Sequence, residues 1–149
     1  MRRHLLTLLA LVLLAAPASA ALRQGTEGPD QLTGTPGADR LVGFGGDDEL
    51  RAGGGGDRLE GGAGRDLLAG DRGNDRLVGG PGPDTLLGGA GADRIAGGGG
   101  RDVVAAGAGN DVVNVRGGGA DQVSCGPGSD VVRVDAADSP GGDCESVQR

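Results

Sequence analysis

Ten aspartates in this chain are spaced nine residues apart. They are Asp30, Asp39, Asp48, Asp57, Asp66, Asp75, Asp84, Asp93, Asp102 and Asp111. A glycine lies two residues before each of them (Gly28, Gly37, Gly46, Gly55, Gly64, Gly73, Gly82, Gly91, Gly100 and Gly109). An aliphatic residue lies two residues after each (Leu32, Leu41, Leu50, Leu59, Leu68, Leu77, Leu86, Ile95, Val104 and Val113). A register held at three positions over ten units indicates one short structural unit that is stacked many times.

Each nine-residue unit offers three properties that a stacked fold can use. The aspartate is an acidic ligand, the glycine allows backbone conformations that other residues avoid, and the aliphatic residue can enter a core. Such a unit cannot bury its apolar residue alone, so neighbouring units must stack to form a continuous core. The pattern therefore predicts a solenoid that binds a hard metal ion through oxygen ligands.

The first 20 residues differ from the rest of the chain. Residues 2–4 are basic, residues 5–16 are almost entirely apolar, and Ala18-Ser19-Ala20 fits the small-residue pattern of a cleavage site. We predict a secretory signal peptide over residues 1–20, cut after Ala20, and hence a secreted, extracellular chain. A retained membrane anchor is the alternative, but the apolar run is shorter than the ~20 residues that a spanning helix needs. We therefore expect no stable membrane insertion.

The composition argues against several kinds of chemistry. The 35 glycines and 7 prolines would indicate disorder if they lacked a period, and the nine-residue period overrides that reading. The chain has no lysine, and its one histidine, His4, lies in the predicted signal peptide. The mature chain therefore has no imidazole base, no histidine metal ligand and no phosphate-loop lysine. A net charge of −7 with a single aromatic residue also argues against a nucleic-acid partner.

Several units follow one nonapeptide pattern closely. Residues 88–96 read Gly-Gly-Ala-Gly-Ala-Asp-Arg-Ile-Ala, and residues 79–87 read Gly-Gly-Pro-Gly-Pro-Asp-Thr-Leu-Leu. This pattern, G-G-x-G-x-D-x-U-x with an aliphatic residue at U, resembles the RTX (hemolysin-type calcium-binding) nonapeptide repeat of secreted bacterial proteins. The resemblance covers about residues 25–133. It implies an all-β fold, a parallel β-roll solenoid in which two repeats form one 18-residue coil.

The resemblance also implies where calcium binds. In the family each ion lies between the loops of repeats n and n+2, held by aspartate carboxylates and backbone carbonyls, a ligand set that suits Ca2+ better than Mg2+. Two more units follow the first ten after a slip of one residue, and they contain Asp121 and Asp130. The expected ligands of multiple calcium ions are therefore the repeat aspartates, Asp30, Asp39, Asp48, Asp57, Asp66, Asp75, Asp84, Asp93, Asp102, Asp111, Asp121 and Asp130.

The repeats depart from the pattern at a few positions. Among the first ten units, the second glycine is replaced in four, by Thr26, Thr35, Phe44 and Asp71, and the first in two, by Ala52 and Ala106. An extra residue lies within residues 116–120. The pattern therefore supports calcium binding least in the first three repeats and around this insertion. The additional carboxylates of Asp47 and Asp71 are either extra ligands or solvated charges.

Arginine alternates along the repeats with a period of 18 residues. It follows every second repeat aspartate, at Arg40, Arg58, Arg76 and Arg94, whereas the intervening units carry Gln31, Glu49, Leu67 and Thr85 at that position. This alternation is expected if odd and even repeats face opposite sides of a two-repeat coil. The four arginines form either a basic stripe that faces a polyanion or a solubilising strand face with Glu60 nearby.

The end of the chain loses the nonapeptide. We expect three segments: the signal peptide at residues 1–20, a β-roll of about 12 repeats at residues 21–133 and a small C-terminal cap at residues 134–149. Cys125 and Cys144 would pin the cap to the roll by a disulfide, as two cysteines in an exported chain favour, with free thiols or metal ligation as alternatives. The carboxylates of the tail are expected to be mainly solvated.

The function that follows is that of an exported calcium-binding repeat protein. Its thin core and stacked carboxylates predict folding on calcium, and it would act as a structural or interaction module without catalysis. The alternatives are an adhesin for a cell-surface polysaccharide or other polyanion, using the arginine face, and a carboxylate-based hydrolase.

Overall fold

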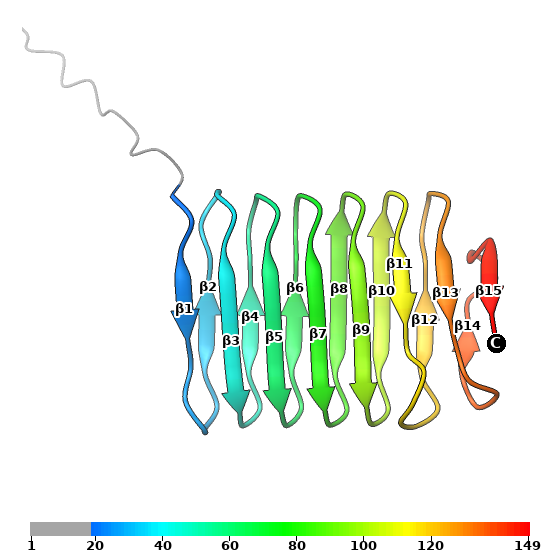
Figure 1. The fold of residues 1–149 in the computed structure, drawn as a ribbon, viewed down its shortest axis with the longest axis horizontal. Coiled ribbons are helices and arrows are strands. Elements are labelled where there is room, and N and C mark those ends of the chain that lie inside the picture. Colours follow the sequence, from blue (N-terminus) through cyan, green and yellow to red (C-terminus); the bar gives the residue numbers. More distant parts are fainter. Residues whose placement is uncertain (1–18) are drawn as a thin grey trace, which may run out of the picture.

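The computed structural model describes residues 19–149, and these residues form strands, turns and loops stacked into one elongated roll (Figure 1). The predicted signal peptide lies outside the described residues except for Ser19 and Ala20. Among the residues described, no helix has the length and apolar character needed to cross a membrane.

The strands form two parallel sheets, and successive strands along the chain belong to alternate sheets. The eight-stranded sheet contains β1 (Leu22–Gln24), β3 (Arg40–Gly45), β5 (Arg58–Ala63), β7 (Arg76–Pro81), β9 (Arg94–Gly99), β11 (Val112–Asn114), β13 (Val131–Arg133) and β15 (Ser146–Gln148). The seven-stranded sheet contains β2 (Gln31–Thr33), β4 (Glu49–Arg51), β6 (Leu67–Ala69), β8 (Thr85–Ala90), β10 (Val103–Ala108), β12 (Gln122–Ser124) and β14 (Ser139–Pro140). In each sheet the strands follow one another in this order, so the chain moves to the other sheet with every repeat.

The register confirms that two repeats form one coil. Leu41 lies opposite Leu59, Leu59 opposite Leu77, and Leu77 opposite Ile95, each 18 residues further along the chain. The prediction of an all-β parallel β-roll is therefore correct. The extra residue near Gly117 is absorbed in the loop between β11 and β12, and Val113 consequently pairs with Val132, 19 residues away.

The aliphatic residue of each repeat forms the core between the two sheets. Eleven of these side chains are at most 3% exposed: Leu41, Leu50, Leu59, Leu68, Leu77, Leu86, Ile95, Val104, Val113, Val123 and Val132. Leu32, in the first coil, is only partly buried against this core. Each repeat thus contributes one large aliphatic side chain to the core, which leaves the loops to supply much of the remaining stabilisation.

Six strands extend beyond the three residues that follow each repeat aspartate. These are β3, β5, β7, β8, β9 and β10, which span six residues each. Pairing continues because the following glycines lie in register, for example Gly80 with Gly98. Gly80 has a φ of 121°, and a Cβ there would lie 2.2 Å from the Gly62 carbonyl oxygen. Glycine is therefore required for coils to stack this closely.

Candidate metal-binding columns

The repeat aspartates stack in two columns, one along each row of loops. Each aspartate precedes a strand, and its side chain turns inward between successive coils instead of toward solvent. Eleven of the twelve, all except Asp30, are at most 4% exposed. Burial of so many carboxylates is costly unless each is hydrogen-bonded or paired with a cation.

In ten of the twelve repeats, from Asp48 to Asp130, one carboxylate oxygen accepts a hydrogen bond from the aspartate of the preceding coil. The backbone N–H of Asp75 donates to Oδ1 of Asp93 at 2.8 Å, and the N–H of Asp84 donates to Oδ1 of Asp102 at 3.0 Å. The same contact recurs along both columns, with Asp30, Asp39, Asp48, Asp57, Asp66, Asp93, Asp102 and Asp111 as the other donors. The Oδ1 atoms are therefore committed to holding the coils together.

The second oxygen has no protein donor in ten of the twelve repeats. These buried Oδ2 atoms belong to Asp48, Asp57, Asp66, Asp75, Asp84, Asp93, Asp102, Asp111, Asp121 and Asp130. A buried carboxylate oxygen without a partner incurs its full desolvation cost. Because the same oxygen lacks a protein donor in ten repeats, we infer that a bound cation is its partner.

Backbone carbonyls approach the same oxygens. A Cβ built on Gly79 would lie 2.3 Å from Oδ2 of Asp84 and 2.6 Å from the carbonyl oxygen of Gly97 in the next coil. The first glycines Gly25, Gly34, Gly43, Gly61, Gly70 and Gly88 are flanked in the same way by one aspartate Oδ2 and one carbonyl. Glycine thus keeps open a space on which two oxygen types converge.

This oxygen set fits calcium. Within residues 19–149, no three His, Cys, Asp or Glu side chains gather into a metal-binding group, so any ion must draw ligands from the backbone as well. Ca2+ accepts mixed carboxylate and carbonyl oxygens in a flexible geometry, whereas Mg2+ demands a stricter octahedron.

A family comparison agrees with this geometry. The family model described as the RTX calcium-binding nonapeptide repeat (4 copies) matches residues 24–59, 51–86 and 78–113, which together span more than half of the chain. The chain belongs to the RTX calcium-binding nonapeptide repeat family. It is accordingly a calcium-binding β-roll, a structural module of a kind that is not typically catalytic. No curated protein matches the chain in a sequence search.

The first two RTX loops differ from the others. The Oδ2 atom of Asp39 accepts hydrogen bonds from the backbone N–H of Thr35 and from its hydroxyl, the latter at 3.0 Å. Thr26 contacts Oδ2 of Asp30 in the same way, with its hydroxyl at 2.9 Å. The threonines that replace the second glycine therefore supply the donors that the later loops lack. Residue identity at this one position separates two satisfied carboxylates from ten unsatisfied ones.

Burial changes the acidity of the RTX carboxyls. Desolvation raises the pKa of Asp84 to about 7 and that of Asp75 to about 6, although a backbone N–H from Asp66 or Asp57 opposes the change. At Asp39 burial also acts to raise the pKa, but the N–H groups of Thr35 and Ala21 outweigh it and the net shift is downward. Asp75 and Asp84, whose Oδ2 atoms lack a donor, thus resist ionisation without a cation because their pKa values are raised.

The raised pKa values predict that acid partly replaces calcium. A carboxyl whose pKa is raised on folding stabilises the fold below its unfolded pKa of about 4, and this contribution disappears as pH rises through the folded value. We therefore expect the calcium-free chain to gain β-structure as pH falls from about 7.5 to about 5, measured by far-UV circular dichroism. Calcium affinity should fall over the same range because protons compete for the carboxylates. A loss of β-structure on acidification would contradict this assignment of the pKa shifts.

The tail continues the roll instead of ending it. The backbone N–H of Asp121 donates to Oδ1 of Asp138 at 3.2 Å, and the N–H of Asp130 donates to Oε2 of Glu145 at 3.0 Å. Asp138 is 7% exposed, so our expectation that the tail carboxylates are solvated is wrong for this residue. Sequence analysis missed this role because the spacing shortens here to eight and then seven residues. The remaining signal was an acidic residue two positions before Pro140 and before Val147.

The two cysteines lie at the junction of roll and tail. A disulfide joins Cys125, which is fully buried, to Cys144, which packs against the core. Asp143, next to Cys144, accepts from the N–H groups of Cys125 and Gly126 at 3.1 and 2.8 Å. The tail is therefore tied to the last RTX coil by a covalent bond and by hydrogen bonds.

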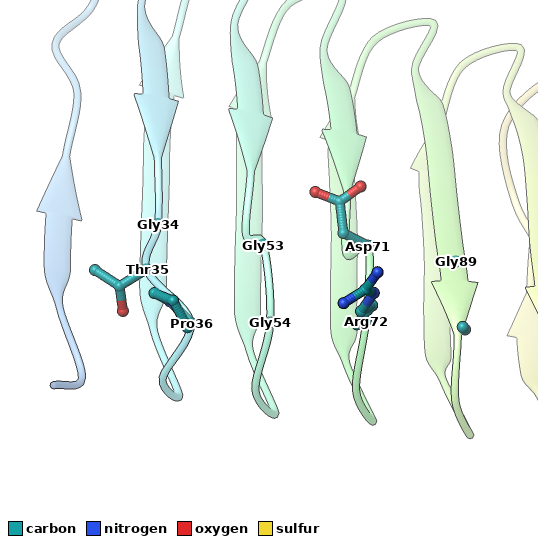
Figure 2. Close-up of a pocket in the computed structure, with 9 residues that line it drawn as sticks. Gly34, Thr35, Pro36, Gly53, Gly54, Asp71, Arg72 and Gly89 are labelled. Atoms are coloured by element: carbon teal, nitrogen blue, oxygen red, sulfur yellow. The ribbon is translucent and has the colours of Figure 1, made fainter. Parts of the chain in front are cut away.

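The two extra carboxylates, Asp47 and Asp71, have different surroundings. The carboxylate of Asp47 accepts a hydrogen bond from the backbone N–H of Arg65 in the next coil at 3.0 Å. Asp71 lies in an open groove between Gly53 and Gly89, the equivalent residues of the adjacent coils, and Figure 2 shows its carboxylate pointing away from the Arg72 side chain. Its φ of 66° falls where those two glycines also have positive φ. A side chain in this conformation carries backbone strain of about 1 kcal/mol.

The strain at Asp71 predicts a stabilising substitution. We expect Asp71→Gly to raise the free energy of unfolding in calcium by about 0.5 kcal/mol, because relief of strain exceeds the entropy that glycine adds to the unfolded chain. Denaturant unfolding at saturating calcium measures this change. Asp71→Asn is the matched control, because it removes the charge and keeps the side chain. Weaker calcium binding by both variants would instead identify Asp71 as a ligand.

Proposed function

We propose that the chain is an exported, non-catalytic protein whose β-roll folds on several calcium ions. The ten unsatisfied Oδ2 atoms, Asp48 through Asp130, would be the carboxylate ligands, completed by carbonyls of the first position in each loop. The observation that carries this proposal is the repetition of a buried oxygen without a donor beside a facing carbonyl. Asp30 and Asp39 would instead form a metal-independent start of the roll, because threonine supplies their donors.

The absence of catalysis follows from how the carboxylates are used. Their Oδ1 atoms accept backbone hydrogen bonds, and both oxygens are turned away from solvent. A carboxylate pair that acts on a glycoside needs access to substrate and a separation suited to one bond. Export rests on the sequence of residues 1–20, and the Cys125–Cys144 disulfide suits an oxidising compartment. Residues 21–133 would be the repeat roll, and residues 134–149 would add a last, irregular coil to both sheets.

Calcium counting tests this function. Equilibrium dialysis of residues 21–149 against calcium should reach about one ion for each unsatisfied carboxylate, on the order of ten. Magnesium at equal concentration should not displace them, because the carbonyl-rich loops do not offer its preferred octahedron. Saturation at one or two ions, or equal binding of magnesium, would contradict the proposal. N-terminal sequencing of the protein recovered from the medium should begin at Ala21.

A further inference from the structure

Four arginines form a continuous ladder on the outer face of the eight-stranded sheet. Register pairs Arg40 with Arg58, Arg58 with Arg76, and Arg76 with Arg94, and all four are exposed. They begin β3, β5, β7 and β9, which run side by side in Figure 1. Their charges therefore repeat at the spacing of neighbouring strands, about 4.8 Å.

The ladder lacks acidic partners. Among the described residues its one ion pair joins Arg40 to Glu60 at 3.4 Å, between two side chains that are about half exposed. The guanidinium groups of Arg58, Arg76 and Arg94 make no ion pair with the residues described. Neighbouring like charges repel one another, so an external anion would relieve an unfavourable arrangement.

A groove follows the ladder. It is lined by all four arginines, by Asn74 and by the repeat aspartate Asp75, with Asp39 and Asp57 at equivalent positions in adjacent coils. These aspartates are nearly completely buried, so they lie behind the arginines. Calcium bound to that column would cancel the charges that now offset the ladder. The groove would then present a row of positive charge on a protein whose net charge is −7.

We propose that this groove binds an extended acidic polysaccharide when calcium is bound. A sugar chain with one carboxylate on each residue can place a charge opposite each successive arginine. The groove offers no aromatic side chain for base stacking, since Phe44, the one aromatic residue, lies near the opposite end of β3. This disfavours single-stranded nucleic acid as the partner. The proposal rests on the calcium-folded roll proposed above, because only the folded coil aligns the four arginines.

The test compares two quadruple variants of residues 21–149 in millimolar calcium. One carries Arg→Gln at Arg40, Arg58, Arg76 and Arg94; the control carries Arg→Gln at Arg65, Arg72, Arg116 and Arg149. Both lose the same charge. The probe is a galacturonate oligosaccharide too short to gel with calcium, and binding is measured by calorimetry. We expect the ladder variant to bind at least about tenfold more weakly, and the control within about twofold of the wild type.

Far-UV circular dichroism of each sample separates the possible failures. A folded wild type that does not bind the oligosaccharide, or equal losses in both variants, would overturn the ladder proposal alone. A chain that stays unfolded in calcium would contradict both this proposal and the calcium-folded roll. A single-stranded DNA oligomer that binds as tightly as the oligosaccharide, with the same loss in the ladder variant, would assign the groove to nucleic acid and overturn the proposal.

Discussion

Removal of calcium is expected to unfold the roll. The core consists of one column of aliphatic side chains from each sheet, such as Leu59 and Leu68, and many residues of the loops are glycine, which loses the most conformational entropy on folding. Carboxylates one coil apart would repel by roughly 1 kcal/mol in water and by about 3–4 kcal/mol at an effective dielectric of 20. A calcium ion bound between these carboxylates replaces their repulsion with attraction to the cation. Occupancy at tenfold the dissociation constant adds about 1.4 kcal/mol for each site, which for about ten sites approaches the stability of a whole domain.

A calcium titration followed by far-UV circular dichroism measures this effect. The mature chain should change cooperatively from coil to β-structure as calcium reaches millimolar concentration, chelator should reverse the change, and magnesium should not produce it. A β-sheet spectrum that is already complete without metal would mean that the roll is stable without calcium. An unchanged coil at saturating calcium would mean that the columns do not bind the ion.

The second large effect is expected from single carboxylates. Asp84→Asn keeps an oxygen that can accept from Asp66 but removes the charge at the unsatisfied position. We expect it to weaken calcium binding at that site by about tenfold or more and to shift the folding transition to higher calcium. Calcium affinity is expected to fall because a neutral amide stabilises a divalent cation less than a carboxylate does.

Asp39→Asn is the matched control. Asp84 and Asp39 lie in different columns of repeat aspartates. The Oδ2 of Asp39 already accepts from Thr35, so the substitution should cost the first coil these hydrogen bonds but leave the number of bound calcium ions unchanged. Thr35→Gly then offers the converse test, because it removes the hydroxyl donor and restores the second glycine of the repeat. We expect that variant to require more calcium to order its first coil. Equal effects of Asp84→Asn and Asp39→Asn would contradict the division between the first two loops and the rest.

The nine-residue period predicted a stacked solenoid, and the resemblance to the RTX repeat predicted that two repeats form one coil. The 18-residue recurrence of Arg40, Arg58 and Arg76 agreed with that coil, and the strand register confirms it. The aspartate and aliphatic pattern recurs in every repeat, whereas the arginine alternation appears only when odd and even repeats are compared. The roll could therefore be predicted because the chain repeats these patterns many times.

The division of labour between the two carboxylate oxygens could not be predicted in the same way. It depends on contacts between residues 18 apart, such as Asp75 with Asp93, whose geometry exists only once the coils stack. The threonine donors at Asp30 and Asp39 appeared in the sequence as lost glycines, although both their backbone N–H and their hydroxyl groups donate to the carboxylates. The roles of Asp138 and Glu145 were hidden because shorter loops break the period while the hydrogen bonds persist.

The most direct test of the central claim is a crystal structure of residues 21–149 grown in calcium, with anomalous scattering used to locate the ions. We predict anomalous peaks about 2.3–2.6 Å from Oδ2 along both columns, from Asp48 to Asp130, and none beside Oδ2 of Asp30 or Asp39. Folded coils whose Oδ2 atoms contact only water or protein donors, without anomalous peaks, would contradict the account.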